Sequence, residues 1–340
     1  MKMEDINRLR VKESSQVGEA RRLASAMGRN LGLDEVGVKH VSIVAAELAA
    51  NLVKHAGGGD LILRALRMAG TSGIETLALD RGPGIGNVGA YLRDGHSTPG
   101  SPGNGLGVIR RLSSLFDIYS KPGQGTAVLS RIWRPSPSAS APLCPIDAGV
   151  VCLPVMAEKA CGDAWALHQT RKRALIMLAD GLGHGPMAAE ASAAAVDIFD
   201  SYSQNSPAEM IERMHAAMLS TRGAAVAVTE VLLDQRVVRF AGVGNISGRI
   251  FSGDAIYNLV SHNGTVGLEA RNIVEFTHPW PEEGLLVLHS DGLSTNWKLD
   301  DYPGLLGRNP ALVAGVLFRD HNQVRDDSTV VVIRETRGAP

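Results

Sequence analysis

The sequence predicts an α+β protein of two domains, on three observations. First, 340 residues suit about two domains of roughly 100–200 residues each. Second, residues 134–145 hold four prolines and three serines in twelve positions, a composition typical of an extended linker. Third, helical patterns mix with antiparallel-looking strands before this segment, and strand patterns dominate after it. We expect a first domain at residues 1–134, a linker at 135–146 and a second domain at 147–340.

The first domain begins with a strand pattern at residues 6–11, followed by helical spacing of apolar residues at 16–31. Asp34 is a candidate N-cap for a longer helix over residues 35–55. The remaining expected elements are strands at 61–66, 74–79, 116–120 and 126–133, a helix at 106–115, and a glycine-rich stretch at 81–107. Helices with an antiparallel sheet predict an α/β sandwich of the α+β class.

The second domain is rich in strand patterns. Strands are expected at 148–153, 164–168, 174–179, 224–233, 237–242, 248–251, 273–277, 285–289 and 328–333, and helices at 186–202, 208–219 and 310–319. This order predicts two stacked sheets flanked by helices. The stretch from 243 to 272 is short, so we expect no large regulatory flap there.

Composition excludes several classes of function. A formal net charge of -1 without a basic run argues against a nucleic-acid partner, because phosphate-backbone binding needs clustered lysine and arginine. Cys144, Cys152 and Cys161 show no metal or redox spacing, and so sparse a count suits a reducing cytoplasm. The N-terminus lacks the apolar stretch of a signal peptide, and no apolar run approaches the ~18–20 residues of a membrane span. A cytoplasmic protein without membrane attachment is expected.

The long helix of the first domain carries Glu47, Asn51 and His55 at spacing i, i+4, i+8, which places them on one face. A carboxylate and an amide one turn apart can hold a general base beside a metal-bound phosphate. The alternative is an ordinary polar helix surface, and for His55 a residue at the end of a helix.

Asp80 directly follows a strand and begins a segment with Gly82 and Gly84. A carboxylate there can accept a hydrogen bond from an exocyclic amine, while glycines let the backbone approach a base.

Gly103, Gly105 and Gly107 open the next helix, where backbone amides form an anion site. Residues 123–126, ending in Thr126, precede the last strand of the domain. Each of these glycine-rich elements alone is a common turn, but all four motifs in order predict a nucleotide site.

Residues 5–134 resemble the GHKL-type ATPases, and among them the small serine kinases of bacterial partner-switching systems. Residues 47–51 match the N box, 80–84 the G1 box and 103–107 the G2 box, and residues 94–100 resemble the lid of the stressosome switch kinase. The resemblance implies an ATP–Mg²⁺ site with Asn51 on the metal, Asp80 on adenine and Glu47 as the catalytic base. No phospho-accepting histidine helix precedes the domain, which argues against a two-component histidine kinase.

Four aspartates of the second half lie at or near predicted strand ends: Asp163, Asp180, Asp291 and Asp326. Hard divalent cations prefer such oxygen ligands. Two such ions about 3.5–4 Å apart need bridging carboxylates and lower the pKa of a shared water. Asp180 is followed by Gly181, so a side chain and a backbone carbonyl can both reach a metal. Any one Asp-Gly pair can be a simple turn, but the set of four predicts a two-metal phosphatase.

Residues 147–334 resemble the bacterial branch of the metal-dependent (PPM, or PP2C-like) serine/threonine phosphatases, the group of sporulation and stress-response enzymes. The resemblance implies two Mn²⁺ or Mg²⁺ ions held by Asp163, Asp180, Gly181, Asp291 and Asp326, with Asp180 and Asp291 as catalytic residues. Residues 241–245 match the structural glycine motif of the group.

The second half departs from this family at three places. Cys161 stands where the first motif usually has glycine. Leu182 stands where eukaryotic members often have a histidine, and His184 is displaced by two positions, so His184 is interpreted as a loop-capping residue rather than a general acid. Asp326 is preferred to Asp327 as a ligand because the neighbouring residue in the family is often asparagine.

Three functions are compatible with these patterns. The leading one is a bifunctional enzyme whose second domain dephosphorylates, and whose first domain phosphorylates, a small partner protein, with a homodimer left open. The family resemblance implies that this partner is a STAS-domain protein of the anti-sigma-antagonist or stressosome type. In the second, the first domain only binds ATP or sequesters a partner. The third, a non-catalytic scaffold, is disfavoured by the four retained acidic positions.

Overall fold

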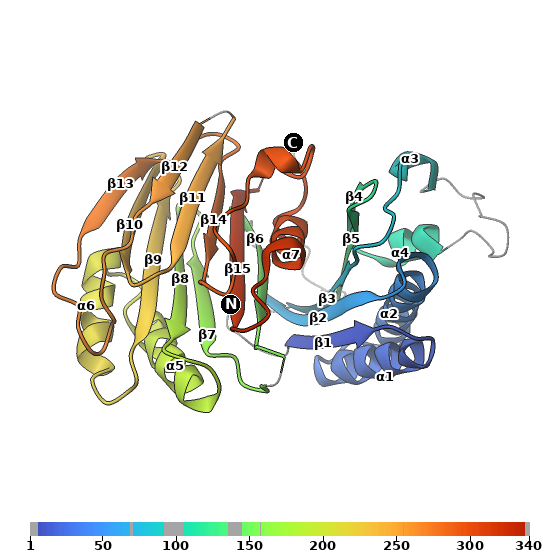
Figure 1. The fold of residues 1–340 in the computed structure, drawn as a ribbon, viewed down its shortest axis with the longest axis horizontal. Helices are drawn as coiled ribbons and strands as arrows, with labels where there is room; N and C mark the ends of the chain where they lie inside the picture. The colour runs from blue at the N-terminus through green and yellow to red at the C-terminus, as the bar shows by residue number, and fades with distance from the viewer. Residues whose placement is uncertain are drawn as a thin grey trace. The chain divides into compact units, whose positions relative to one another are not determined.

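The computed structural model describes residues 6–68, 71–91, 105–134, 145–156, 158–253 and 255–336. They divide into two compact units, which Figure 1 shows as a ribbon. The N-terminal unit holds the described residues between 4 and 142 together with Leu299–Arg319, and the C-terminal unit holds those of 143–298 and 320–340. The expected second domain at 147–340 is therefore not one continuous block, because residues 299–319 join the other unit. Most of the expected linker, 135–144, lies outside the described residues, and Ile146 already begins a strand.

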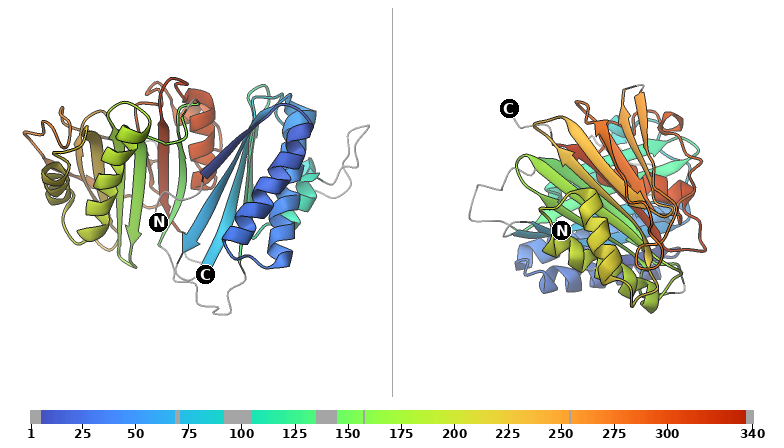
Figure 2. Two further views of the ribbon diagram at one scale, coloured as in Figure 1. Left: turned by 90° about the horizontal axis from the view of Figure 1, so that it is seen from below. Right: turned by 90° about the vertical axis from the view of Figure 1, so that its left-hand side faces the viewer.

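The N-terminal unit is built on one antiparallel sheet of order β1-β2-β3-β5-β4. Its strands are β1 (Ile6–Val11), β2 (Gly59–Met68), β3 (Thr71–Leu79), β4 (Leu115–Lys121) and β5 (Gly125–Trp133). Its helices are α1 (Ser15–Asn30), α2 (Glu35–Ala56), the one-turn α3 (Val88–Tyr91) and α4 (Gly105–Leu112). The views in Figure 2 place α1 and α2 along one face of this sheet.

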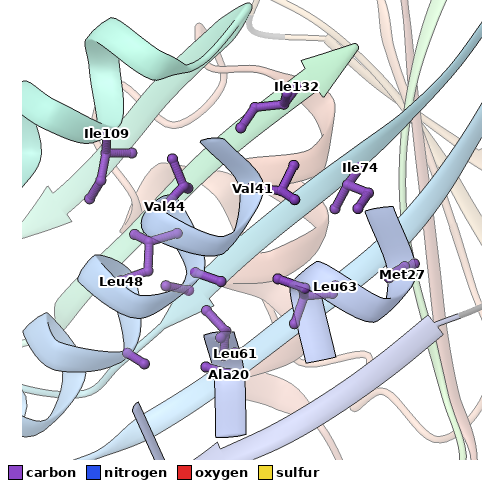
Figure 3. Packing of buried hydrophobic residues seen from close by; sticks show 14 of the residues in the cluster. Ala20, Met27, Val41, Val44, Leu48, Leu61, Leu63, Ile74, Ile109 and Ile132 are labelled. Carbon is purple, nitrogen blue, oxygen red and sulfur yellow. The ribbon is translucent and has the colours of Figure 1, made fainter. Parts of the chain in front are cut away.

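The core of this unit lies between the sheet and its helices. Figure 3 shows Val41, Val44 and Leu48 of α2 in one packed cluster with Leu61 and Leu63 of β2. Burying such side chains stabilises the fold by roughly 1.5–3 kcal/mol each.

Helix α2 begins and ends as its sequence predicts. The Asp34 side chain accepts a hydrogen bond from the Gly37 amide at 2.7 Å and caps the N-terminus. Gly57 ends the helix in the left-handed conformation, with φ of 70°.

The opposite face of this sheet is also buried, and a segment distant in sequence packs on it. Residues 299–319 comprise a 3₁₀ turn (Leu299–Asp301) and most of α7 (Pro310–His321). A Cβ on Gly315 would lie 2.7 Å from Leu77 Cδ2 and 3.0 Å from Leu79 Cδ2, so the helix backbone approaches β3 closely. All ten residues from Pro310 to Arg319 are buried, which fits a helix that is apolar on nearly every side.

The C-terminal unit contains two five-stranded antiparallel sheets, β13-β10-β9-β8-β7 and β12-β11-β14-β15-β6. The first sheet contains β7 (Asp163–Gln169), β8 (Arg173–Gly181), β9 (Ala224–Leu232), β10 (Val237–Val243) and β13 (Glu275–Pro279). The second contains β6 (Ile146–Leu153), β11 (Ser247–Ser252), β12 (Ala255–Leu259), β14 (Leu285–His289) and β15 (Ser328–Glu335). Helix α5 (Pro186–Ser201) packs on β7 and β8, and α6 (Pro207–Ala217) on β9 and β10. The expected helix-flanked β-sandwich is confirmed.

One strand was not anticipated from the sequence. β12 lies inside the stretch 243–272, and four of its five residues are exposed or half-buried, so it lacks the apolar alternation of a typical strand.

Helix α2 also corrects the expectation about membrane spans. By length and composition alone it is long and apolar enough to cross a membrane, with a mean hydropathy of 1.4, and it is the one such helix in the described ranges. Its apolar face packs in the core of the N-terminal unit, as core helices of folded domains also do.

Candidate functional site

The predicted base and metal ligand of the first half face the start of α4. A Cβ built on Gly105 would lie 3.4 Å from Glu47 Oε2 and 3.5 Å from Asn51 Oδ1. Both side chains are half-buried, one helical turn apart on α2. The structure thus brings Glu47, Asn51 and Gly105 together, while His55 is exposed at the end of the helix. The absence of a side chain on Gly105 keeps the space above these groups open.

The third glycine of this motif, Gly107, lies in the first turn of α4. Gly103 and the lid residues 94–100 lie outside the described residues, so their placement stays a prediction.

Asp80 follows β3 and is held by backbone amides. Its Oδ1 accepts hydrogen bonds from the Gly82 amide at 2.8 Å and the Thr126 amide at 3.1 Å. Burial raises the pKa of Asp80, and these two amides together with the charges of Arg319 and His55 act in the opposite direction. Both backbone bonds end on Oδ1, which leaves Oδ2 able to accept from a ligand.

Glycines shape the turn around Asp80. A Cβ on Gly82 would lie 2.7 Å from Ala56 Cα, and one on Gly84, with φ of 70°, would overlap the Lys121 carbonyl. Gly125, with φ of 98°, approaches the Asp80 carbonyl. Side chains at these positions would displace the turn, so the sequence pattern reflects close backbone packing.

The four aspartates of the second half gather at one end of the sandwich. Asp163 begins β7 and pairs in register with Asp180, the penultimate residue of β8, next to Gly181. In β8, Leu175, Met177 and Ala179 face the helices, so the alternation turns Asp180 to the other face of its sheet. Asp291 follows β14 and Asp326 precedes β15. β14 and β15 belong to the other sheet of the sandwich. Each sheet therefore contributes two aspartates to the same end of the sandwich.

Asp163 is almost fully buried, with an exposed fraction of 1%. Its Oδ2 accepts a hydrogen bond from the Ser290 hydroxyl at 2.7 Å, and no hydrogen bond with standard geometry reaches Oδ1 among the described residues. Because Ser290 adjoins Asp291, this bond ties the two sheets together at the carboxylate cluster.

The carboxylates raise one another's pKa. Burial raises the pKa of Asp163 to about 7, and the charges of Asp327 and Asp326 add to the effect. Burial raises the pKa of Asp180 to about 9, with further contributions from Asp163, Asp291 and Asp326. Such like-charge clusters are unfavourable without a counter-ion. The donor set consists of oxygens, which suits hard divalent cations.

A cation would still require side-chain rotation. Within the described ranges, no three histidine, cysteine, aspartate or glutamate side chains already surround one point at coordinating distance. The donor chemistry and the buried, underused Oδ1 of Asp163 fit divalent ions, whereas the ligand geometry is not pre-formed.

Comparisons with known proteins bear on both units. Residues 11–132 match the family described as "Histidine kinase-like ATPase domain", and residues 170–335 match "Stage II sporulation protein E (SpoIIE)". The chain is 30% identical to the serine/threonine-protein kinase RsbT of Bacillus subtilis (strain 168) over 131 residues, which are 38% of this chain and 98% of the relative. It is 29% identical to the phosphoserine phosphatase RsbX of the same organism over 136 residues, 39% of this chain and 68% of the relative.

A solved structure from work on the bacterial stressosome as a modular system that controls secondary messenger signalling is also similar. It has 25% sequence identity and a TM-score of 0.53, and the match covers 56% of this chain and 99% of that one.

The chain belongs to the histidine kinase-like ATPase family through its N-terminal domain, which is joined to a serine/threonine phosphatase domain that matches the SpoIIE family.

In the phosphatase domain, the two neighbouring aspartates differ in their surroundings. Asp327 is 2% exposed and accepts backbone hydrogen bonds from Val155 and Gly162, both at 2.7 Å. Asp326 is half-buried, and its Oδ1 accepts from the Asp327 amide at 2.9 Å. Asp327 therefore braces the loop before Asp163, which leaves Asp326 as the better candidate ligand.

The sequence reasoning missed a residue that touches Asp291. Asn245 Nδ2 donates to Asp291 Oδ2 at 2.6 Å, whereas the family resemblance implies only a structural role for residues 241–245. Gln323 Nε2 adds a hydrogen bond to the Asp291 carbonyl at 3.1 Å. Asn245 could have been predicted as a site residue because it belongs to the glycine motif at 241–245, whereas no sequence motif includes Gln323.

His184, Cys152 and Cys161 lie beside the phosphatase cluster, whereas Cys144 is outside the described residues. His184 Nδ1 lies 3.2 Å from Glu158 Oε1, which agrees with a loop-stabilising role. The Sγ atoms of buried Cys152 and Cys161 are 3.8 Å apart, a proximity that their spacing in the sequence does not reveal. The contact with Cys152, together with burial, raises the pKa of Cys161, so this thiol stays protonated.

Proposed function

We propose that this protein is a bifunctional partner-switching enzyme. Its phosphatase domain removes phosphate from a phosphoserine or phosphothreonine, and its ATPase domain transfers phosphate from ATP to a serine or threonine. The main support is the convergence of four aspartates: Asp163, Asp180, Asp291 and Asp326. Because burial and mutual repulsion disfavour their charged forms, such a cluster of carboxylates is expected to need divalent cations.

In the phosphatase domain, Asp163, Asp180, Asp291 and Asp326 would hold two Mn²⁺ or Mg²⁺ ions, with the Gly181 carbonyl as a further ligand. Bound cations supply Lewis acidity and a nucleophilic water at neutral pH. Ser290 orients Asp163 and Asn245 orients Asp291 through the hydrogen bonds described above. Asp327 keeps residues 155–162 in place beside the cluster.

In the ATPase domain, Asn51 would bind the Mg²⁺ that accompanies ATP, and Glu47 would accept the proton of the attacking hydroxyl. Asp80 Oδ2 would accept a hydrogen bond from the adenine amino group. Gly82, Gly84 and Thr126 shape the base site, and Gly103, Gly105 and Gly107 would bring backbone amides to the phosphates. The support is that Glu47 and Asn51 face Gly105.

The substrate that we propose is a STAS-domain protein of the anti-sigma-antagonist or stressosome type, acted on in the cytoplasm. The support is the pairing, in one chain, of regions similar to a serine/threonine kinase and a phosphoserine phosphatase of one organism. Opposed activities on one chain would set the phosphorylation level of that partner, with a homodimer left open.

The phosphatase proposal is tested by phosphate release from a phosphoserine STAS protein, with Mn²⁺ added or chelated. We expect metal-dependent release by the wild-type chain and a loss of about 10²-fold or more in Asp180→Asn, by analogy with other electrostatic catalytic groups. Equal release by both proteins would contradict the assignment of Asp180.

The kinase proposal is tested separately in the Asp180→Asn background, where product is not removed. We expect label transfer from ATP to the STAS protein, abolished by Glu47→Ala without weaker ATP binding. ATP binding without any transfer by the Asp180→Asn chain would favour the alternative, in which this domain only binds nucleotide or sequesters a partner.

A further inference from the structure

An arginine from a part of the chain far from the nucleotide-binding motifs contacts the sheet of the N-terminal unit at Asp80. Arg319 lies near the end of α7, is 7% exposed, and its Nη1 donates a hydrogen bond to the main-chain oxygen of Asp80 at 3.0 Å. In return, Arg81 Nη2 donates to the main-chain oxygen of Arg319. Residues 80–81 and residue 319 are thus held together by two hydrogen bonds of opposite direction within the N-terminal unit.

This arginine completes the set of contacts that fix Asp80. The Asp80 amide donates to the Thr126 carbonyl at 2.9 Å, and Oδ1 accepts from the Gly82 and Thr126 amides. Arg319 binds the remaining main-chain acceptor of this residue. Within the described residues, Oδ2 is then the one oxygen of Asp80 that remains available to accept a hydrogen bond from a ligand. The direction in which Oδ2 points depends on how firmly the backbone of Asp80 is held.

Helix α7 is anchored at its other end by different groups. The Asn309 amide donates to Asp117 Oδ2 at 2.8 Å, and Arg308 Nη1 lies 3.2 Å from Asp117 Oδ1. Asp117 lies on β4, away from the turn at Asp80. The chain therefore offers an arginine on each side of this helical segment: Arg308, just before α7, pairs with Asp117, and Arg319, near the end of α7, contacts Asp80.

We propose that Arg319 is a positioning residue of the nucleotide site, which holds Asp80 so that its free carboxylate oxygen meets the 6-amino group of adenine. The proposal rests on the nucleotide binding proposed above. Residues 299–319 lie within the part of the sequence that matches the phosphatase family, and in this proposal they help to recognise the base. The positive charge of Arg319 also opposes the effect of burial on the pKa of Asp80, which favours the carboxylate form.

The test compares two nucleotides in the full-length chain. ADP carries the 6-amino group, and inosine diphosphate carries an oxygen in its place. We expect Arg319→Met to raise the Kd for ADP about tenfold, the size expected for one hydrogen bond to a charged group, and to leave the Kd for inosine diphosphate unchanged. Isothermal titration with Mg²⁺ present measures both constants without turnover.

Arg308→Met is the matched control, since it removes an arginine that lies just before α7 and pairs with Asp117 instead of Asp80. We expect it to change neither constant. Arg319→Lys retains a single donor and a similar volume, so we expect an intermediate Kd for ADP, and this variant serves if Arg319→Met does not fold. Circular dichroism checks the folding of each variant.

The two Kd values distinguish a role of Arg319 in base recognition from a purely structural role. An unchanged Kd for ADP in Arg319→Met and Arg319→Lys would overturn the proposal, and so would an equal loss for both nucleotides, which indicates a merely structural role. A wild-type chain that binds neither nucleotide would instead overturn the proposed nucleotide site itself. A wild-type chain that prefers ADP, with variants that behave like wild type, would remove only the role of Arg319.

Discussion

At the scale of single residues, the phosphatase domain concentrates negative charge where it is least tolerated. Asp180 faces Asp163 across two strands, and the charges of Asp291 and Asp326 also raise its pKa. A site built this way lowers the stability of the metal-free protein, and the cations proposed above would restore that stability on binding.

We predict that Asp180→Asn stabilises the metal-free protein at pH 7, by about 1–2 kcal/mol. Burial and the neighbouring carboxylates raise the pKa of Asp180 to about 9, so folding forces this group to take up a proton, and an asparagine does not have to. We also predict that Mn²⁺ raises the melting temperature of the wild-type chain by several degrees and that of the variant much less. Differential scanning calorimetry with and without a chelator measures both effects. Asp234→Asn, at an exposed ion pair with Lys172, should change neither. A wild-type response to Mn²⁺ that persists in Asp180→Asn would contradict this account.

A second residue-scale feature is the buried charge network of the N-terminal sheet. Glu75 on β3 is 3% exposed, and its two oxygens accept from Arg64 Nε at 3.0 Å and Arg131 Nε at 2.7 Å. Burial acts to raise the pKa of Glu75, but the two guanidinium groups outweigh burial and hold the pKa below its usual value of 4.5.

The direction of this shift fixes its pH dependence. A lowered pKa means that the ionised form stabilises the fold fully above about pH 4.5 and that this stabilisation is lost as the pH falls through the lower, folded-state value. We predict that Glu75→Gln lowers the free energy of unfolding at pH 7 by roughly 3–5 kcal/mol and flattens its pH dependence below pH 4.5. Urea unfolding at several pH values tests this. Glu335→Gln, whose partner Arg236 is partly exposed, should cost less than about 1 kcal/mol.

At the scale of elements, α7 begins with a polar cap. Asn309 Oδ1 accepts from the Ala311 amide at 2.9 Å, while the Asn309 amide itself donates to Asp117 of β4. The same residue therefore starts the helix and joins it to the sheet.

We predict that Asn309→Ala lowers the stability of the N-terminal unit by about 1 kcal/mol through loss of this cap. Hydrogen exchange of amides in α7 and β4 should increase locally. Ser206→Ala, which removes the capping box of α6, should cost a similar amount but raise exchange in α6 alone. Increased exchange of β4 amides in Ser206→Ala, or none in Asn309→Ala, would contradict the assignment.

At the scale of the whole molecule, the N-terminal unit includes an element from the other end of the chain. A domain boundary at the linker would separate this unit from residues 299–319, which contain most of α7. Leu77, Leu79 and Leu129 alternate with residues of the main core, so they lie on the other face of the sheet, yet all are buried. Residues 299–319 pack within the same unit, and Gly315 contacts Leu77 and Leu79.

We predict that a chain ending at residue 142 exposes this apolar face, associates with itself, and binds a synthetic peptide of residues 299–319. A Gly315→Leu peptide should bind about tenfold more weakly, because a Cβ there already meets Leu77 at 2.7 Å. Analytical ultracentrifugation measures the association, and fluorescence anisotropy measures both peptides. Equal binding of the two peptides would show that α7 does not pack at this surface.

Most local features of this protein could be predicted from its amino-acid sequence. Alternation and helical spacing gave the strands and helices mostly to within a few residues, and Asp34 marked the start of α2, because periodicity and caps are properties of neighbouring residues. The motif residues of both domains were also readable, since each motif is contiguous. β12 escaped because an exposed strand carries no apolar alternation.

Features that depend on long-range contacts became visible only in the folded chain. The bond from Asn245 to Asp291, the bracing role of Asp327, the approach of Cys152 to Cys161 and the place of α7 in the N-terminal unit join residues that no local pattern connects. Arg319 is the clearest case, because it lies 239 positions from Asp80 and only the folded chain brings its guanidinium to that carbonyl.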